Sequence, residues 1–179
     1  MTPSQEKTII IEVRSGDIEQ YRAIIERYHR GLIQHLYNTL HDGDLAEDIA
    51  QEVFIRAYTK INQYDEHFAF STWLYKIADN LTFRYLKQAR NVPLDVVAEV
   101  IPDDGRSPTG QVDRSFTKQA VRDALDRLPI GYRQVMTLYY WDRCNYKEIA
   151  LIMGRPIGTI QTWLFRAKEE LKKELYGQI

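Results

Sequence analysis

Hydrophobic residues recur every three or four positions through the first third of the chain, which is the period of helices that bury one face. Asp17-Ile-Glu-Gln20 has the form of a capping box and predicts a helix that ends near His41-Asp42-Gly43. A second box, Asp44-Leu-Ala-Glu47, predicts a helix to about Ile61. The inward stripe of this second helix comprises Leu45, Ile49, Val53 and Ala57.

A loop is predicted from Asp65 to Phe70, followed by a helix that Ser71 or Thr72 caps and that continues to about Arg90. One side of this helix carries Trp73, Leu74, Ile77, Ala78 and Leu81. An alternating pattern occurs only in Thr8 to Val13, where a strand and a frayed helix both fit.

Residues 91–112 contain three prolines and two glycines, so no helix is expected to cross them. We interpret this stretch as a flexible linker between two helical domains. It holds one basic and four acidic residues. A pseudo-ligand for a basic surface is therefore an alternative to a passive spacer.

The remainder predicts a helix from about Phe116 to Leu128, broken by Pro129, and a short helix to about Trp141. Asn145-Tyr-Lys-Glu148 is a third capping box and starts a helix that stops at Gly154. The next helix starts at Gly158-Thr159 and carries Ile160, Leu164, Ala167, Leu171 and Leu175 on one side. The fold class is therefore all-α, with domains at residues 1–90 and 113–179 joined by the linker.

The last two helices meet the demands of a helix-turn-helix. Ala150 is small enough for a close helix crossing, Gly154 permits the turn, and Ile160 fills the shared core. Gln161 can read an adenine edge, and the amides of Gly158 and Thr159 can hold a phosphate. The outward residues of the second helix are Thr159, Gln161, Thr162, Phe165, Arg166 and Lys168. An ordinary helical hairpin with a solvated face is the alternative.

Charge supports a nucleic-acid partner for the second domain. The chain has 24 Lys and Arg against 25 Asp and Glu, but residues 113–179 hold 12 basic and 8 acidic residues. In the first domain an acidic segment from Asp42 to Glu66 precedes a basic one, which suggests two different partners, with a plain solvated helix face as the alternative.

Composition excludes several classes of protein and of metal or disulfide site. No apolar run reaches 18 residues, and Met1 to Lys7 lacks the features of a signal peptide, so we expect no membrane span and no export. The single Cys144 can form neither an internal disulfide nor a cysteine-based zinc site. We therefore expect a cytoplasmic protein with no metal and no cofactor.

An enzyme is the hypothesis from another class. Glu26-Arg-Tyr-His29 has the Glu-x-x-His spacing of di-iron bundles, but a second copy is missing. We find no phosphate-binding glycine loop and no nucleophile with a base, and we predict no catalytic residues. His29 and His35 are expected to be surface or packing residues. A self-sufficient helix-turn-helix repressor and a scaffold without DNA function are further alternatives.

Several motifs occur together in a familiar order: Ala46 to Phe54 (AEDIAQEVF), Phe70 to Asn80 (FSTWLYKIADN), Leu128-Pro, Tyr146 to Ala150 (YKEIA) and Pro156 to Ile160 (PIGTI) with Arg166-Ala167. Over most of residues 16–175 the chain resembles the extracytoplasmic-function (ECF) sigma factors of bacteria. The resemblance implies a region-two domain that binds RNA polymerase and the promoter's minus-10 element. It also implies a region-four domain that binds the minus-35 element.

The resemblance also implies roles for individual residues. The polymerase-binding surface, for the clamp helices of the β′ subunit, comprises Glu47, Asp48, Gln51, Glu52 and Arg56. The minus-10 surface comprises Phe68, Phe70, Ser71, Trp73, Lys76, Asn80, Arg84 and Lys87. The minus-35 surface comprises Arg155, Gly158, Thr159, Gln161, Thr162, Phe165, Arg166 and Lys168.

Further partners follow from the same resemblance. They are the β flap of core polymerase, promoter DNA, and an anti-sigma factor that can hold the protein at the membrane until an envelope or stress signal releases it to the nucleoid. The chain departs from the family pattern at Arg84, where many members have Asp, and at Gln161, Thr162 and Trp163. These departures concern the promoter sequence. Trp163 lies beside Ile160 and Leu164, so both partial burial and DNA contact are open to it.

Overall fold

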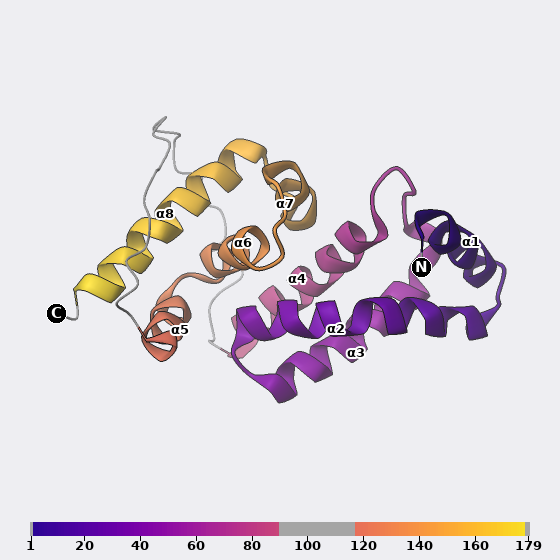
Figure 1. The fold of residues 1–179 in the computed structure, drawn as a ribbon, viewed down its shortest axis with the longest axis horizontal. Helices are drawn as coiled ribbons and strands as arrows, with labels where there is room; N and C mark the ends of the chain where they lie inside the picture. Colours follow the sequence, from indigo (N-terminus) through magenta and orange to yellow (C-terminus); the bar gives the residue numbers. More distant parts are fainter. Residues whose placement is uncertain (1, 90–116, 178–179) are drawn as a thin grey trace. The chain divides into compact units, whose positions relative to one another are not determined.

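A computed structural model describes residues 2–89 and 117–177 of the chain. The chain divides into two compact units, residues 1–82 and 83–179 (Figure 1). Every regular element in the two described ranges is a helix, which confirms the all-α prediction. The predicted linker at residues 91–112 lies outside the described residues.

The N-terminal segment is helical. Helix α1 spans Pro3–Arg14, and Thr2 caps it by accepting a hydrogen bond from the backbone N–H of Gln5. Ile10 and Val13 are buried, so α1 packs one face against the rest of the first unit. The helical alternative for Thr8 to Val13 is therefore the correct one.

The next two helices form an antiparallel pair. The short 3₁₀ helix η1 (Ile18–Gln20) leads into α2 (Tyr21–Leu40), and α3 spans Gly43–Thr59. The cap of α3 is Asp42, whose side chain accepts from Leu45 N–H, and the prediction of Asp44 was wrong. Asp42 has the extended backbone that a cap requires, whereas Asp44 already lies in the first helical turn.

Helix α4 spans Phe70–Ala89 and follows a second 3₁₀ helix, η2 (Ile61–Gln63). Ser71 and Thr72 lie inside α4, so the prediction that one of them caps the helix was wrong. The last buried residues of α4 are Leu81 and Thr82, where the first unit ends. Its core includes Ile24, Leu32, Leu36, Ile49, Val53, Ala57, Phe70, Leu74 and Ala78.

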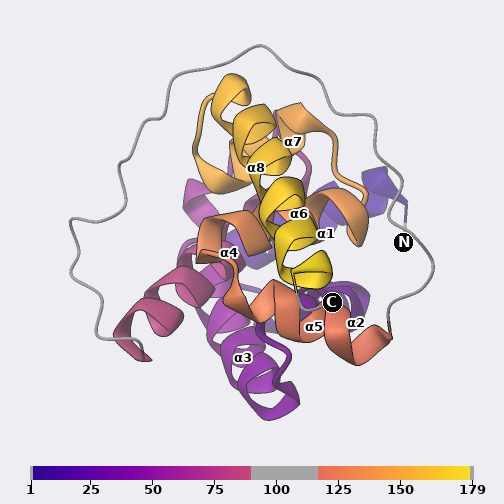
Figure 2. The same ribbon diagram turned by 90° about the vertical axis from the view of Figure 1, so that its left-hand side faces the viewer.

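The described residues 117–177 of the second unit form four helices. They are α5 (Lys118–Arg127), α6 (Ile130–Tyr140), α7 (Tyr146–Met153) and α8 (Ile157–Tyr176). The long helix α8 contacts each of the other three, with α7 beside its N-terminal end and α5 beside its C-terminal end (Figures 1 and 2). Helix α5 begins after Thr117, which caps it, and the predicted start at Phe116 lies outside the described residues.

The helix-turn-helix is present as α7, a turn and α8. Asn145 and Glu148 form the predicted capping box, and Gly154 ends α7 with φ 63°, a conformation in which Cβ would be strained. Helix α8 begins at Ile157, one residue earlier than predicted. Its inward stripe is fully buried, as predicted, at Ile160, Leu164, Ala167, Leu171 and Leu175.

The ring of Trp163 fills the space beside Gly131 of α6. A Cβ placed on Gly131 would lie 2.6 Å from Cζ3 of Trp163, which is closer than packed carbon atoms approach. Tyr132 meets the same ring edge-on, with 6.1 Å between ring centroids. Trp163 is therefore half-buried and part of the α6–α8 contact.

We expect Gly131→Ala to destabilise the second unit by about 1–3 kcal/mol, because the added methyl group forces the indole from its site. Hydrogen exchange of the α8 backbone amides in the full chain measures this loss. The matched control is Gly158→Ala, since a Cβ on Gly158 meets no atom within 4 Å. Equal exchange rates in the Gly131→Ala variant and the wild type would show that the indole can move at no cost.

Candidate functional site

The outer face of α3 is mostly acidic. Glu47, Asp48 and Gln51 are exposed, whereas Glu52 and Arg56 are half-buried and paired, with 2.6 Å between Glu52 Oε1 and Arg56 Nε. Residues three and four positions apart share one face of a helix. The structure therefore brings the five predicted polymerase-binding residues onto neighbouring rows of α3.

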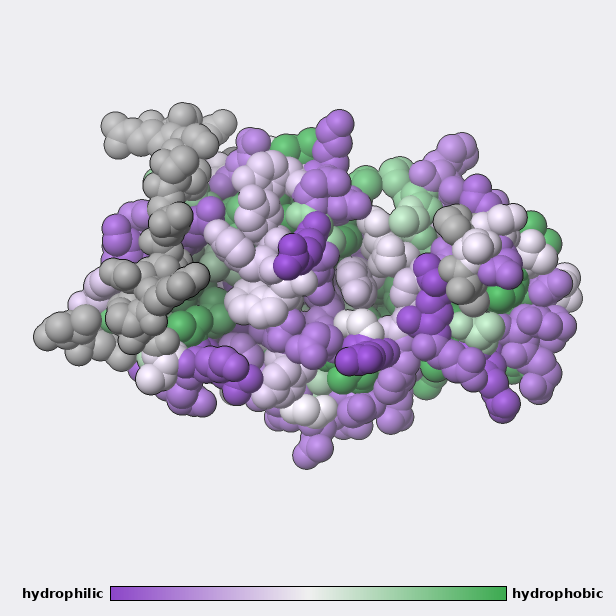
Figure 3. Space-filling model, viewed as in Figure 1, coloured by the Kyte–Doolittle hydropathy of each residue, from purple (hydrophilic) through white to green (hydrophobic). Residues whose placement is uncertain are grey.

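An exposed apolar side chain lies among them. Ile55 is 61% exposed although it is large and hydrophobic, and it is four positions after Gln51. On the face shown in Figure 3, polar residues dominate and apolar residues occupy small separate areas. Sequence reasoning missed Ile55, because a single isoleucine inside a helical pattern is ordinarily assigned to the core.

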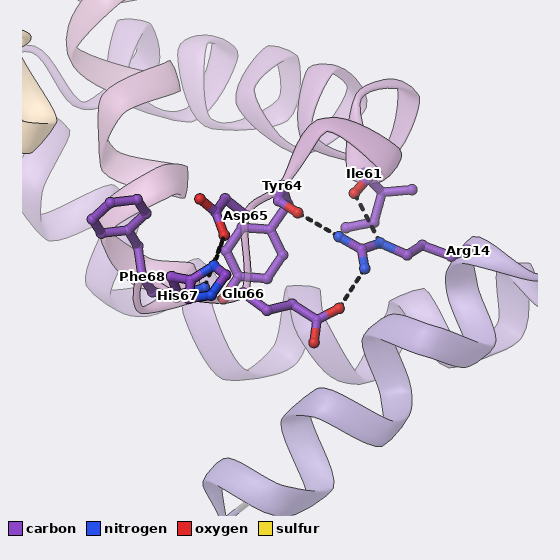
Figure 4. A network of polar contacts seen from close by, with 7 residues as sticks. All are labelled: Arg14, Ile61, Tyr64, Asp65, Glu66, His67 and Phe68. Carbon is purple, nitrogen blue, oxygen red and sulfur yellow. Dashed lines mark hydrogen bonds and ion pairs between the residues drawn. The ribbon is translucent and has the colours of Figure 1, made fainter.

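The residues Tyr64–Ala69, called here the α3–α4 loop, have an internal network of hydrogen bonds (Figure 4). The hydroxyl of Tyr64 donates to the carbonyl of Phe68 at 2.7 Å. The backbone N–H groups of His67 and Phe68 donate to the side chain and the carbonyl of Asp65, at 3.0 and 3.2 Å. The loop is thus a set of linked turns with a defined conformation.

Asp65 and His67 also pair through their side chains, with 2.6 Å between Oδ1 and Nδ1. Hydrogen bonds from the backbone N–H and then the ring of His67 hold the pKa of Asp65 below its usual value. The side chain of His67 is 91% exposed, and Phe68 is 44% exposed. The loop therefore presents an imidazole and a phenyl ring to solvent.

Tyr64, the first residue of this loop, belongs to an aromatic cluster. The ring of Tyr64 lies 5.2 Å from that of Phe70 and 5.4 Å from that of Trp73, measured between centroids. Burial raises the pKa of Tyr64, so its hydroxyl stays protonated and able to donate at neutral pH.

Phe70 is completely buried, and a direct contact of its side chain with DNA does not fit this structure. The ring packs against Tyr28, Tyr64 and Trp73. Trp73 is half-buried in the same cluster and keeps part of its surface accessible. Phe70 therefore supports the residues around it.

Four of the remaining predicted minus-10 residues form one side of α4. Lys76, Asn80 and Arg84 are exposed and lie four positions apart, on neighbouring turns. Lys87 is half-buried, with its ammonium 5.5 Å from the centroid of the Phe83 ring. Ser71, in the first turn, is half-buried. This side of α4 thus carries three cations and an amide.

In the second unit, the outward residues of α8 are accessible to different degrees. Gln161 is exposed, and the half-buried residues are Gly158, Thr159, Thr162, Phe165, Arg166 and Lys168. The hydroxyl of Thr162 donates to the carbonyl of Gly158 at 2.9 Å. No side chain caps the start of α8, where Pro156 precedes the helix, so its first amides have no side-chain acceptor.

Aromatic rings hold two of the predicted DNA-binding cations. The guanidinium of Arg155 lies 5.7 Å from the centroid of the Trp163 ring. The ammonium of Lys168 lies over Tyr139 and Tyr140, at 5.7 and 5.5 Å. Such cation–π contacts orient a charge without neutralising it.

The structure gives no support to the metal hypothesis. Glu26 and His29 are both exposed, and His29 pairs with Glu47 at 3.6 Å. Within residues 2–89 and 117–177, no group of three or more His, Cys, Asp or Glu side chains could hold a metal ion. His35 is buried beside Asp79 and stacks on Tyr75, as a packing residue.

No helix of the described ranges has the length and apolar character needed to cross a membrane.

Two family models match the chain. Sigma-70 region 2 matches residues 24–92, and Sigma-70, region 4 matches residues 118–171. The first match covers most of α2, all of α3, the α3–α4 loop and α4, and the second covers α5, α6, α7 and most of α8. Helix α1 lies outside both matches.

Curated relatives match over nearly their whole lengths. The ECF RNA polymerase sigma factor SigW of Bacillus subtilis is 37% identical over 94% of this chain and 96% of its own. The RNA polymerase sigma-H factor of Pseudomonas aeruginosa is 30% identical over 98% of this chain and 96% of its own.

A solved structure has a similar fold. The sigma factor RpoE of Bartonella quintana, in complex with the anti-sigma factor NepR, superposes with a TM-score of 0.65 at 22% identity, covering 89% of this chain and 98% of that one. With the two family matches and the curated relatives, the conclusion is that the chain belongs to the ECF sigma factors of bacterial RNA polymerase.

Proposed function

We propose that this protein acts without catalytic chemistry of its own, by directing core RNA polymerase to promoters and starting the opening of their DNA. The observation that carries the proposal is the division of surfaces between α3 and α4. The outer face of α3 is acidic, one side of α4 is cationic, and the hydrogen-bonded loop between these two helices exposes aromatic and imidazole rings. The helix-turn-helix supplies a separate DNA-binding surface.

The acidic face of α3 is proposed to dock on the clamp helices of the β′ subunit. Complementary charge speeds encounter and fixes the register of two surfaces, while an apolar side chain at the centre adds affinity. Asp48 and Glu52 supply the charge, and Ile55 is suited to the apolar contact. The β flap is the second proposed polymerase contact.

The α3–α4 loop and α4 are proposed to capture an unpaired base of the minus-10 element. An accessible ring such as Phe68 can stack on a base, and the amide of Asn80 can read a base edge. Lys76, Arg84 and Lys87 can neutralise the adjacent phosphates.

Helix α8 is proposed to enter the major groove of the minus-35 element. Gln161 and Thr162 can meet base edges, and Arg155, Arg166 and Lys168 can meet phosphates or guanine. The uncapped amides at Gly158 and Thr159 can bind a backbone phosphate.

An anti-sigma factor is the proposed inhibitory partner, because the structurally similar RpoE of Bartonella quintana is in complex with one. We further propose that the protein works in the cytoplasm, at the nucleoid when active, in a stress or envelope-signal response.

In vitro transcription tests the function. Bacterial core polymerase and the purified chain are incubated with a pool of genomic fragments, and we expect initiation at specific sites that core enzyme alone does not use. A stand-alone repressor would instead form symmetric dimers and bind DNA tightly by itself. Native mass and gel shifts with and without core polymerase separate the two functions.

Charge reversal at Asp48 and Glu52 should weaken polymerase binding by about tenfold or more, because like charges then face each other across the interface. Binding of the full chain to core enzyme, measured at two salt concentrations, checks this. Glu26→Lys is the matched control, since Glu26 is exposed on α2 outside the proposed surface. Unchanged affinity of the charge-reversed variant for core polymerase would show that the docking surface lies elsewhere.

Asn80→Ala and Trp73→Ala should slow open-complex formation by about fivefold to a hundredfold and leave polymerase affinity intact, because a base contact contributes about 1–3 kcal/mol. Asn80 gives the cleaner result, since its side chain is exposed whereas Trp73 packs against Phe70. Permanganate footprinting of holoenzyme measures the opening, with Gln34→Ala as control. Equal loss of opening and affinity would contradict the assigned role.

Removing the charge in Arg166→Gln should weaken promoter binding by holoenzyme and reduce the salt dependence by about one unit of slope, as expected for one lost phosphate contact. Lys172→Gln is the control, because Lys172 is an exposed cation farther along α8. If both variants keep the wild-type salt slope, Arg166 makes no phosphate contact.

A further inference from the structure

Helix α1 lies outside the region matched by either family model, yet it contacts the α3–α4 loop directly. All three nitrogens of the Arg14 guanidinium are engaged there (Figure 4). Nε donates to the carbonyl of Ile61 at 3.2 Å, and Nη2 donates to the carbonyl of Tyr64 at 2.5 Å. Nη1 pairs with Oε1 of Glu66 at 2.5 Å.

These acceptors mark the place where the loop leaves the preceding helix. Ile61 begins η2 and its carbonyl also accepts from the backbone N–H of Tyr64, whereas Tyr64 follows the last residue of η2 and its carbonyl lies at the start of the loop. The planar fork of arginine can meet two carbonyls and a carboxylate at fixed angles, which the single ammonium of lysine cannot do. Arg14 therefore fixes the path of the backbone at the start of the loop.

A second contact from α1 acts on the other end of the loop indirectly, through Tyr28 of α2. Glu6 Oε2 accepts a hydrogen bond from the hydroxyl of Tyr28 at 2.5 Å and pairs with Arg27 at 3.0 Å. The ring of Tyr28 packs on Phe70, the residue that follows the loop, with 5.4 Å between centroids. Burial, followed by the hydrogen bond to Glu6, raises the pKa of Tyr28 to about 12, so the hydroxyl keeps its proton at neutral pH.

From these contacts we infer that α1 holds the α3–α4 loop in the conformation that captures a promoter base, with Arg14 as the positioning residue. The inference rests on the proposed function and deepens it. A loop that is ordered before DNA arrives does not pay for its ordering on binding, and its exposed rings meet the base at a fixed angle. Base selectivity then depends on a side chain that never touches DNA.

This role is separable from the contribution of α1 to the core. Ile10 and Val13 make the buried contact of α1, whereas the side chain of Arg14 is 24% exposed and that of Glu66 is 40% exposed. Changing Arg14 therefore removes polar contacts to the loop and leaves the apolar face of α1 in place.

The first test concerns the free full chain. In Arg14→Gln the backbone amides of His67 and Phe68 should exchange about tenfold faster, because local opening of the loop becomes easier. The amides of Leu32 and Leu36 in the core of α2 should keep their wild-type rates. Lys7→Gln, which removes an exposed cation of the same helix, should change neither set. Unchanged exchange at His67 and Phe68 in Arg14→Gln would overturn the inference.

The second test concerns holoenzyme. Open-complex rates are compared on a promoter and on copies that carry each other base at the captured position. Arg14→Gln should reduce the ratio of matched to mismatched rates by about fivefold, and Arg14→Lys should recover part of it. Glu66→Gln, which removes only the ion pair, should reduce it less than Arg14→Gln. A merely destabilised protein would lower all rates together and leave the ratio unchanged, and that result would overturn the positioning role.

The two tests also separate this inference from the proposed function. If wild-type holoenzyme failed to initiate at any site, the proposed function would fail, and with it the role in base capture. A fast-exchanging loop in Arg14→Gln together with an unchanged selectivity ratio would instead overturn the inference and leave the sigma-factor function standing.

Discussion

The buried ring of Tyr64 connects the hydrophobic core of the first unit with its exposed loop, and the geometry of the proposed base-capture surface depends on it. The ring of Tyr64 packs against Phe70 and Trp73. Its hydroxyl donates a hydrogen bond to the carbonyl of Phe68, and its backbone carbonyl accepts one from Arg14. A residue with a smaller or apolar side chain could satisfy only some of these demands. Tyrosine satisfies them because it has a large apolar body and a polar tip.

Each of the helices α3, α4 and α8 likewise packs against its core with one side and presents proposed contact residues on the other. In α3, α4 and α8 a stripe of small and aliphatic residues packs inward, and this stripe fixes the rotation of the helix about its axis. The outward residues then point in a determined direction without contacts of their own. Rows such as Asp48, Glu52 and Ile55, or Lys76, Asn80 and Arg84, are aligned for this reason.

Much of the fold could be predicted from patterns of residues a few positions apart, whereas contacts between residues distant in the sequence could not. The capping box of Asn145 and Glu148, the left-handed Gly154 and the buried stripe of α8 each involve residues a few positions apart. The cap of α3 was missed because Asp44 has Glu47 three positions later and fits the capping-box pattern, whereas Asp42 has Leu45 there; the extended backbone of Asp42 identifies it as the cap.

The contacts of Arg14 could not be predicted, because its partners lie 47 to 52 residues away along the chain and no local pattern marks them. Phe70 and Trp163 show the same limit: their burial follows from Tyr28 and Tyr64 in one case and from Gly131 in the other.

Opening DNA costs about 1.4 kcal/mol per base-pair step, and a stacked base returns about 1–3 kcal/mol. Fixing the backbone of one residue costs about 1–2 kcal/mol, so ordering the loop on DNA would cancel the gain from the base. A sigma factor that contributes only one or two captured bases to melting therefore needs the loop ordered in advance, while polymerase supplies the rest of the bubble.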